Sequence, residues 1–126
     1  LGFSADDRSE NLRRSSEVAQ LMNNAGLICI AALVAPSEEI RQRAAETVGP
    51  DRFLVIHLDA PLEVCRERDE SGIYDRVDRG EIHNFPGVSA TYEAPENPAL
   101  RLETDKINLS DCVQQILDLL ESLEIL

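Results

Sequence analysis

Arginines gathered near the start of the chain are the side chains whose type and spacing could do chemistry. Arg8, Arg13 and Arg14 each present a planar fork of N–H donors, which suits the oxygens of a sulfate or a phosphate. Asn11 stands three residues after Arg8, so a helix would place both side chains on one face. The alternative is that these arginines are solvated surface residues of that helix.

The overall charge limits the partners that such a cluster could have. The formal net charge is −12, so broad nucleic-acid binding, which needs a basic face, is not expected. A local arginine cluster can still bind an anion within an acidic protein. No apolar run approaches the ~18 residues of a membrane span, so we expect no membrane partner. The three cysteines, Cys29, Cys65 and Cys112, lack metal-ligand spacing, and we interpret them as free buried thiols of a cytoplasmic protein without a metal site.

The elements that would position these side chains alternate between helix and strand. An N-cap at Ser4 predicts a long helix to about Asn24, with Val18, Leu21, Met22 and Ala25 on its apolar face. The predicted elements that follow are a buried strand over 27–34, a helix over 37–48, a buried strand over 53–58, a helix over 62–68, a strand over 100–103 and a helix capped by Asn108. This order is typical of an α/β fold with a parallel sheet.

One long segment does not fit this alternation. Residues 69–98 are rich in charges, glycine and proline and show little periodicity, so we predict a functional loop or lid rather than a core element. The last helix should carry an apolar stripe made of Val113, Ile116, Leu117, Leu120 and Leu123.

A phosphate-binding loop is the element that nucleotide chemistry would require, and it is missing. The 126 residues contain no GxxxxGK[ST], and the chain opens on a helix at Ser4 rather than on a strand. We therefore expect the chain to be a piece of a longer domain.

A long motif at the start of the chain resembles the signature of adenylylsulfate (APS) kinases. The segment Gly2–Arg14, GFSADDRSENLRR, is similar to GFSxxDRxENxRR. Further matches follow in the same order at Glu17–Ala19, Ala25–Leu27, Pro36, Leu58–Leu62, Arg68–Asp69, Gly72–Tyr74, Gly80–Ile82, Asn84–Gly87 and Tyr92–Glu96. The resemblance covers essentially the whole chain.

The resemblance implies a P-loop kinase that transfers the ATP γ-phosphate, with Mg²⁺, to the 3′-hydroxyl of APS and so forms PAPS. It implies that Phe3, Arg8, Asn11 and Phe85 bind APS, and that the backbone at Val34 and Ala35 contacts it. The two aromatic rings would stack on the two faces of the adenine. The alternatives are that Phe3 is a hydrophobic staple, that Phe85 anchors the lid, and that Asn11 has no contact with the substrate.

The resemblance also implies how the domain and its sheet are organised. Residues 1–126 would be the C-terminal two-thirds of one APS kinase domain, a three-layer α/β/α parallel sheet of the P-loop NTPase type that is incomplete here. The P-loop strand would lie between the strands at 27–34 and 53–58, and the catalytic, ATP-binding and Mg²⁺-binding residues would lie upstream. We expect these residues alone to be inactive and unfolded, or to be rescued by strand exchange. A homodimer, and a fused or partner ATP sulfurylase, are further implications.

Two segments depart from the family pattern. Ala35 occupies the position of a serine that some members phosphorylate, so a phosphoserine form is excluded. The lid, usually KGLYKKARxG, reads SGIYDRVDRG over 71–80, and it loses positive charge at Ser71, Asp75 and Asp78. We expect Arg76 and Arg79 to compensate in part. These departures motivate an alternative function, a catalytically degenerate module that binds APS or PAPS or only packs against a partner.

Overall fold

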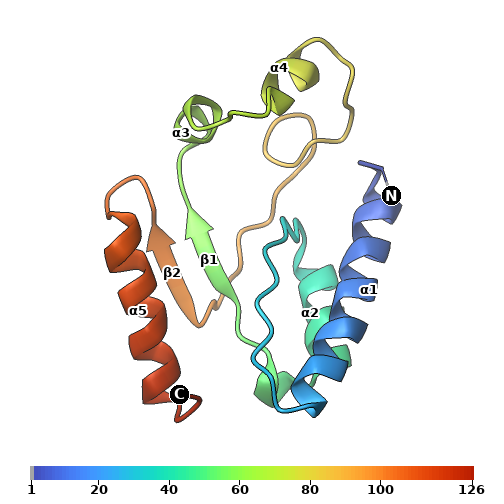
Figure 1. Cartoon of the computed structure of the whole chain (residues 1–126). Helices are drawn as coiled ribbons and strands as arrows, with labels where there is room; N and C mark the ends of the chain where they lie inside the picture. The colour runs from blue at the N-terminus through green and yellow to red at the C-terminus, as the bar shows by residue number, and fades with distance from the viewer. Residues whose placement is uncertain (1) are drawn as a thin grey trace. The chain divides into compact units, whose positions relative to one another are not determined.

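The computed structural model describes residues 2–126 and divides them into two compact units (Figure 1). The first unit comprises Leu1–Phe53 and Gly72–Ala94, and the second comprises Leu54–Ser71 and Pro95–Leu126. The elements in chain order are α1 (Ala5–Asn24), α2 (Glu38–Val48), the 3₁₀ turn η1 (Pro50–Arg52), β1 (Ile56–Asp59), α3 (Leu62–Glu67), α4 (Ile73–Asp78), β2 (Leu100–Glu103) and α5 (Leu109–Ser122).

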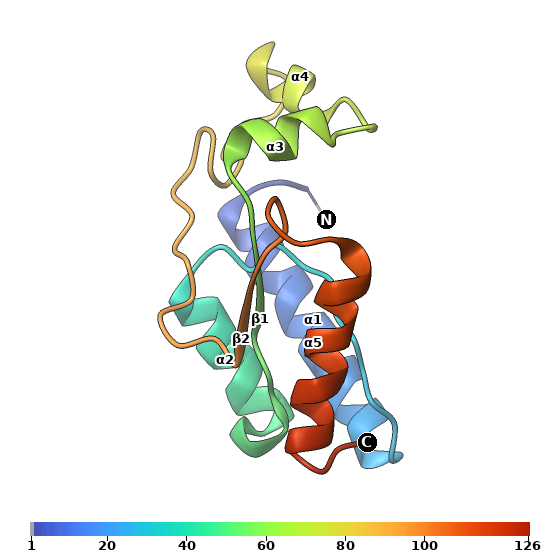
Figure 2. The same cartoon turned by 90° about the vertical axis from the view of Figure 1, so that its left-hand side faces the viewer.

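The first unit is built on the pair α1 and α2, which run side by side in Figures 1 and 2. Ser4 caps α1 as predicted, because its hydroxyl accepts a hydrogen bond from the Asp7 amide. Ser37 caps α2 in the same way, through the Ile40 amide. Small and apolar side chains, Ser16 on α1 and Ala44 and Val48 on α2, are buried. The start of both helices therefore agrees with the sequence prediction. The predicted apolar face of α1 does not, because Val18, Leu21 and Met22 are exposed.

The predicted strand over 27–34 is wrong. These residues run on without helix or strand structure, and Leu27, Ile28, Ile30, Leu33 and Val34 are all exposed, Ile30 to 91%. A wholly apolar strand needs hydrogen-bonded neighbours and cover on both faces. Within the described part of the first unit there is no other strand to pair with it, so the segment stays uncovered.

The second unit holds a parallel pair of strands with α5 beside β2 (Figure 2). Ile56 pairs with Leu100 and Asp59 with Glu103, and Leu102 is completely buried. The strand predicted over 53–58 is shorter and later than expected. Phe53 closes the 3₁₀ turn, and the four residues of β2 limit the length of the ladder. The α/β class with parallel strands is confirmed, although two of the three predicted strands form.

The segment predicted to be an irregular loop or lid contains a short helix. Gly72 and Gly80, both with positive φ, flank the short helix α4, which lies inside the segment predicted to be irregular. Val77 and Ile82 are buried, so this segment contributes to the core of the first unit. Two side chains of a segment that was predicted to be a loop or lid rather than a core element are therefore part of that core.

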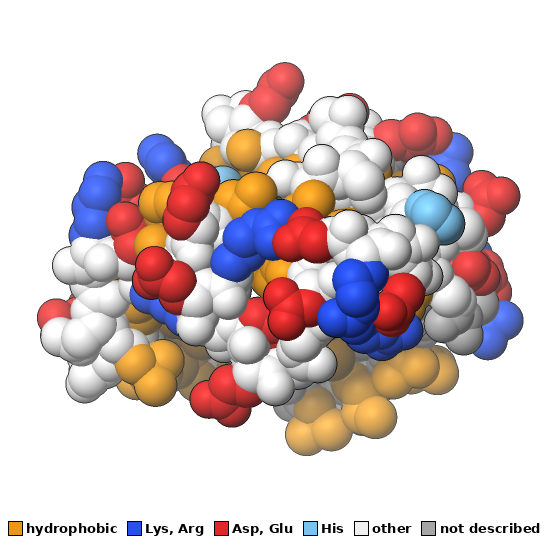
Figure 3. Space-filling view, turned by 90° about the horizontal axis from the view of Figure 1, so that it is seen from above, with side chains coloured by type: hydrophobic (Ala, Val, Ile, Leu, Met, Phe, Trp, Pro, Cys, Tyr) orange, Lys and Arg blue, Asp and Glu red, His pale blue; other side chains and the backbone are white. Residues whose placement is uncertain are grey.

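Two smaller expectations about burial also differ. The three cysteines are free as expected, but Cys29 is exposed and only Cys112 is fully buried, because the segment around Cys29 is uncovered. On α5 the stripe is incompletely covered, since Val113, Leu117 and Leu123 remain exposed. Acidic and basic side chains are interspersed on the face drawn in Figure 3. No helix among residues 2–126 is long and apolar enough to cross a membrane.

Candidate functional site

An open pocket of about 500 Å³ lies at the N-terminal end of α1. Its lining includes three of the residues predicted to bind substrate, Phe3, Arg8 and Asn11, together with Gly2, Asp7 and Arg14. The cap at Ser4 fixes this turn, because the Ser4 hydroxyl also donates to the Asp7 carboxylate at 2.8 Å. Phe3 just before the helix and Arg8 in its first turns are thereby brought to the same place.

Arg8 is held by two aromatic rings and lacks a full set of hydrogen bonds. Its guanidinium carbon lies 5.6 Å from the centroid of the Phe3 ring and 5.8 Å from that of Phe85. Its Nε donates to the Phe3 carbonyl at 3.3 Å, but its buried Nη2 has no partner among the described residues. Burial lowers the pKa of Arg8, yet an arginine stays charged at neutral pH. The site therefore offers a half-buried cation with one buried, unpaired nitrogen.

Phe85 is positioned by its own loop and by α4. Its carbonyl accepts hydrogen bonds from the amides of Val88, Ser89 and Ala90, and its amide donates to the Ser89 hydroxyl at 2.9 Å. The Tyr74 ring meets the Phe85 ring edge to face at 5.3 Å. The predicted pair of aromatic residues is thus brought together around Arg8, from segments far apart in the sequence.

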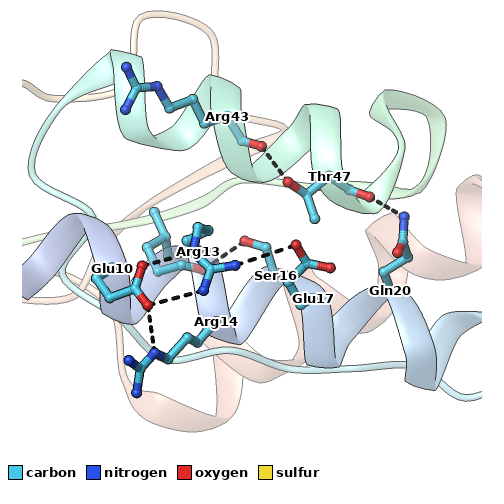
Figure 4. Close-up of polar contacts among 9 residues, drawn as sticks. Glu10, Arg13, Arg14, Ser16, Glu17, Gln20, Arg43 and Thr47 are labelled. Carbon is cyan, nitrogen blue, oxygen red and sulfur yellow. Dashed lines mark hydrogen bonds and ion pairs between the residues drawn. The ribbon is translucent and has the colours of Figure 1, made fainter.

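The other arginines of α1 are engaged with acidic side chains (Figure 4). Glu10 accepts from Arg13 at 2.8 Å and from Arg14 at 2.7 Å. The hydrogen bond from Arg13, followed by that from Arg14, lowers the pKa of Glu10 to about 2. These contacts support the alternative that Arg13 and Arg14 are surface residues. Arg8 differs from them because its unpaired nitrogen is buried.

Val34 and Ala35 are not among the residues that line the pocket. Ala35 has a positive φ of 42°, and its carbonyl accepts a hydrogen bond from Arg41 at 2.6 Å. The Arg41 side chain is only 6% exposed and also binds Glu38 at 2.7 Å. The sequence reasoning missed Arg41, because an Arg three residues after a Glu on a helix looks like an ordinary surface ion pair.

The lid arginines are brought together on one carboxylate. Arg79 contacts Glu81 at 2.7 Å and Arg76 contacts it at 3.3 Å. The bond from Arg79 lowers the pKa of Glu81, and the pKa of Arg79 is raised in return. Glu81 was not predicted as a partner, since the charge pattern of the lid does not show which arginines it would bind.

The base of the lid is tied to the start of α2. The Glu93 amide donates to the Pro36 carbonyl at 2.8 Å, and the Glu93 carboxylate accepts from the Glu38 amide at 2.9 Å. These two bonds connect the end of the lid with the segment that carries Ala35.

Two features that could mark an ATP–Mg²⁺ site are absent from the described residues. The sequence has no GxxxxGK[ST], and no group of three or more His, Cys, Asp or Glu residues within residues 2–126 is placed to hold a metal ion. What residues 2–126 do offer is an arginine with a buried, unpaired nitrogen next to two aromatic rings.

Comparisons with known proteins agree with the motifs. A family model described as Adenylylsulphate kinase matches residues 1–103. The bifunctional enzyme CysN/CysC of Rhodopirellula baltica is 52% identical over 121 residues, which are 96% of this chain and 19% of that protein. The adenylyl-sulfate kinase of Phocaeicola vulgatus is 49% identical over 119 residues, 94% of this chain and 58% of that protein. The chain therefore spans less than two thirds of the length of either relative.

A solved structure supports the fold. The APS kinase CysC of Mycobacterium tuberculosis, in complex with AMPPNP and APS, matches with a TM-score of 0.84 and 39% identity. The match covers 96% of this chain and 70% of that one. The fold is accordingly the α/β P-loop NTPase type, in which the chain forms part of the parallel sheet. The chain belongs to the adenylylsulphate kinase family.

Proposed function

We propose that the protein phosphorylates the 3′-hydroxyl of adenylylsulfate, and that residues 1–126 supply the adenylylsulfate side of the active site. The observation that carries this proposal is the Arg8 guanidinium, which lies over the Phe3 and Phe85 rings with its buried Nη2 unpaired. ATP is the proposed phosphoryl donor and Mg²⁺ the proposed metal ion, both bound mainly by residues outside these 126.

The chemistry of the pocket suits a nucleotide that carries an anion. A buried donor without a partner costs about 1–3 kcal/mol, and a phosphate or sulfate oxygen would satisfy it with a charge-assisted hydrogen bond. The rings can stack on a base for ~1–3 kcal/mol, more than the ~0.5–1 kcal/mol of an exposed cation–π contact. Arg8 would move from the rings to the anion as the purine takes its place.

The proposed role of the pocket residues is to position adenylylsulfate. Asn11 lines the same pocket as Arg8 and would hold the substrate in one orientation. Phosphoryl transfer depends on in-line placement of the acceptor hydroxyl and on electrostatic stabilisation, with no covalent intermediate on the protein. The bifunctional relative supports a second domain or a partner protein. ATP sulfurylase activity is proposed for that domain or partner, and a homodimer is also proposed.

A second candidate is a degenerate module that binds adenylylsulfate or PAPS without turnover. The ion pairs of Arg76 and Arg79 with Glu81 favour it, because these guanidiniums are already neutralised in the lid. Ala35 in place of serine is compatible with either candidate.

Product formation separates the two candidates. The natural full-length polypeptide is incubated with adenylylsulfate, ATP and Mg²⁺, and PAPS is measured by chromatography, with a reaction lacking ATP as the control. Sustained, ATP-dependent formation of PAPS is expected for the kinase. Binding of adenylylsulfate without any product would identify the degenerate module, and the absence of both binding and product would contradict both candidates.

A further inference from the structure

Ala35 has a backbone conformation that an alanine adopts only under constraint. Its φ of 42° lies in the left-handed region, where the Cβ atom of an L-residue is crowded by its own backbone. Such a residue persists where the surrounding structure holds it, and residues of this kind cluster at functional sites. The question is which contacts hold Ala35.

Arg41 provides the direct restraint. Its Nη1 donates to the Ala35 carbonyl at 2.6 Å, while its Nη2 and Nε donate to one Glu38 carboxylate oxygen at 2.7 and 3.2 Å. The Arg41 side chain is almost fully buried on α2, whereas Arg43 on the same helix is exposed and only pairs with Glu39. A buried guanidinium that cannot lose its proton is a fixed set of donors.

A second restraint acts on the residues just after Ala35. Glu93 accepts from the Glu38 amide and donates its own amide to the Pro36 carbonyl. Glu38 therefore meets Arg41 through its side chain and Glu93 through its backbone. The segment 35–38 is held from α2 on one side and from the end of the lid on the other.

We propose that Arg41 is a positioning residue, which sets the peptide of Ala35 in the direction needed to contact adenylylsulfate. Arg41 itself would not touch the substrate, and it would act through Ala35. The identity of the ligand rests on the function proposed above, while the restraint of Ala35 by Arg41 rests on the geometry alone.

A double-mutant cycle tests the proposal in the natural full-length polypeptide. The proteins are wild type, Arg41→Met, Ala35→Gly and the double variant, with Arg43→Met as the matched control on α2. Adenylylsulfate affinity is measured by calorimetry, and stability by the urea midpoint. Glycine adopts a φ of this kind without steric cost, so the double variant no longer needs the restraint.

The expected result is a rescue. Arg41→Met alone should weaken adenylylsulfate binding about tenfold, as expected for loss of a hydrogen bond from a charged group. In the Ala35→Gly background the same change should weaken binding less than about threefold, and Arg41→Lys should keep part of the affinity because it retains a donor. Arg43→Met should leave binding unchanged. A general loss of folding would not be rescued by glycine at position 35.

Equal losses of affinity in the two backgrounds would overturn the proposal, because Arg41 would then act independently of Ala35. If the wild-type protein binds no adenylylsulfate, the proposed function fails. The urea midpoints then still test whether Arg41 restrains Ala35. Midpoint shifts that are smaller in the Ala35→Gly background would support a restraint of Ala35 by Arg41, and strictly additive shifts would overturn it.

Discussion

Arg8 and its neighbours on α1 carry the same charge but have different surroundings. Arg13 and Arg14 share Glu10 at the surface, where ion pairs contribute little to stability. No ion pair joins Arg8 to an acidic side chain among residues 2–126, and Arg8 keeps a buried nitrogen unpaired. The buried unpaired donor of the cluster therefore belongs to Arg8, although Arg14 also lines the pocket.

Glu81 is the second residue whose charge bears on function, because it neutralises the lid arginines. We predict that Glu81→Gln tightens adenylylsulfate binding by about threefold, because the guanidiniums of Arg76 and Arg79 would be free to attract an anion. Calorimetric titration at low salt measures the effect, which should fade as salt is raised. Glu70→Gln, an equal change of charge at another exposed residue, is the control. Unchanged or weaker binding by Glu81→Gln would show that Glu81 does not compete with the ligand.

The N-terminal end of α1 affects both the stability of the helix and the shape of the pocket. Its N-cap Ser4 lies between Phe3 and the first turn, so we predict that Ser4→Ala lowers the free energy of unfolding by about 1 kcal/mol and also weakens adenylylsulfate binding. Ser15→Ala removes a hydroxyl bonded to the Asn11 carbonyl on the same helix and serves as the control. Urea denaturation and calorimetry give the two readouts. A loss of stability with unchanged affinity would show that the Ser4 cap does not contribute to adenylylsulfate binding.

The acid sensitivity of α1 should depend on Glu10. Its pKa is about 2 in the folded protein against an ordinary value of 4.5, so its ion pairs stabilise α1 fully above pH 4.5. That stabilisation is lost as pH falls from 4.5 towards about 2, because the unfolded chain takes up the proton first. We predict that in Glu10→Gln the urea midpoint changes less with pH in this range than it does in wild type. Glu46→Gln on α2 should leave the slope as in wild type, and an unaltered slope in Glu10→Gln would contradict the prediction.

The elements that the sequence predicted well are those fixed by local interactions. The caps at Ser4, Ser37 and Asn108 and the apolar periodicities set α1, α2 and α5 within a residue or two. The strand at 27–34 failed because a strand depends on partners that its own residues do not specify. The fold class followed from the alternation of helices and strands, and the gathering of Phe3, Arg8 and Phe85 followed from the family resemblance. The partners of Arg41 and Glu81 depend on tertiary placement, which no spacing in the sequence reveals.

At the scale of the whole molecule, much apolar surface is left uncovered. Val18, Leu21 and Met22 on α1 are exposed, as are the apolar side chains of residues 27–34. Exposed apolar patches of this kind mark surfaces that other protein segments cover, or sites of aggregation. Residues 1–126 taken alone therefore have more apolar surface than a stable monomer normally shows.

We predict that a polypeptide limited to residues 1–126 is unfolded or self-associates. Sedimentation velocity over a range of concentrations measures the association, and urea denaturation measures cooperativity. Ile30→Lys, which places a charge on the most exposed apolar side chain of the 27–34 segment, should reduce association, whereas Gln42→Lys at an exposed position of α2 should not. A monomer with one cooperative unfolding transition would contradict the prediction.

The measurement that tests the central claim most directly is a calorimetric titration of adenylylsulfate into the natural full-length polypeptide and its Arg8→Met variant. Arg43→Met, which removes an exposed arginine paired with Glu39, is the matched control. We predict saturable binding by wild type and by Arg43→Met, and a loss of at least about tenfold in Arg8→Met, as expected for a charge-assisted hydrogen bond. Equal affinities of wild type and Arg8→Met, or no binding by either, would contradict the assignment of this pocket to adenylylsulfate.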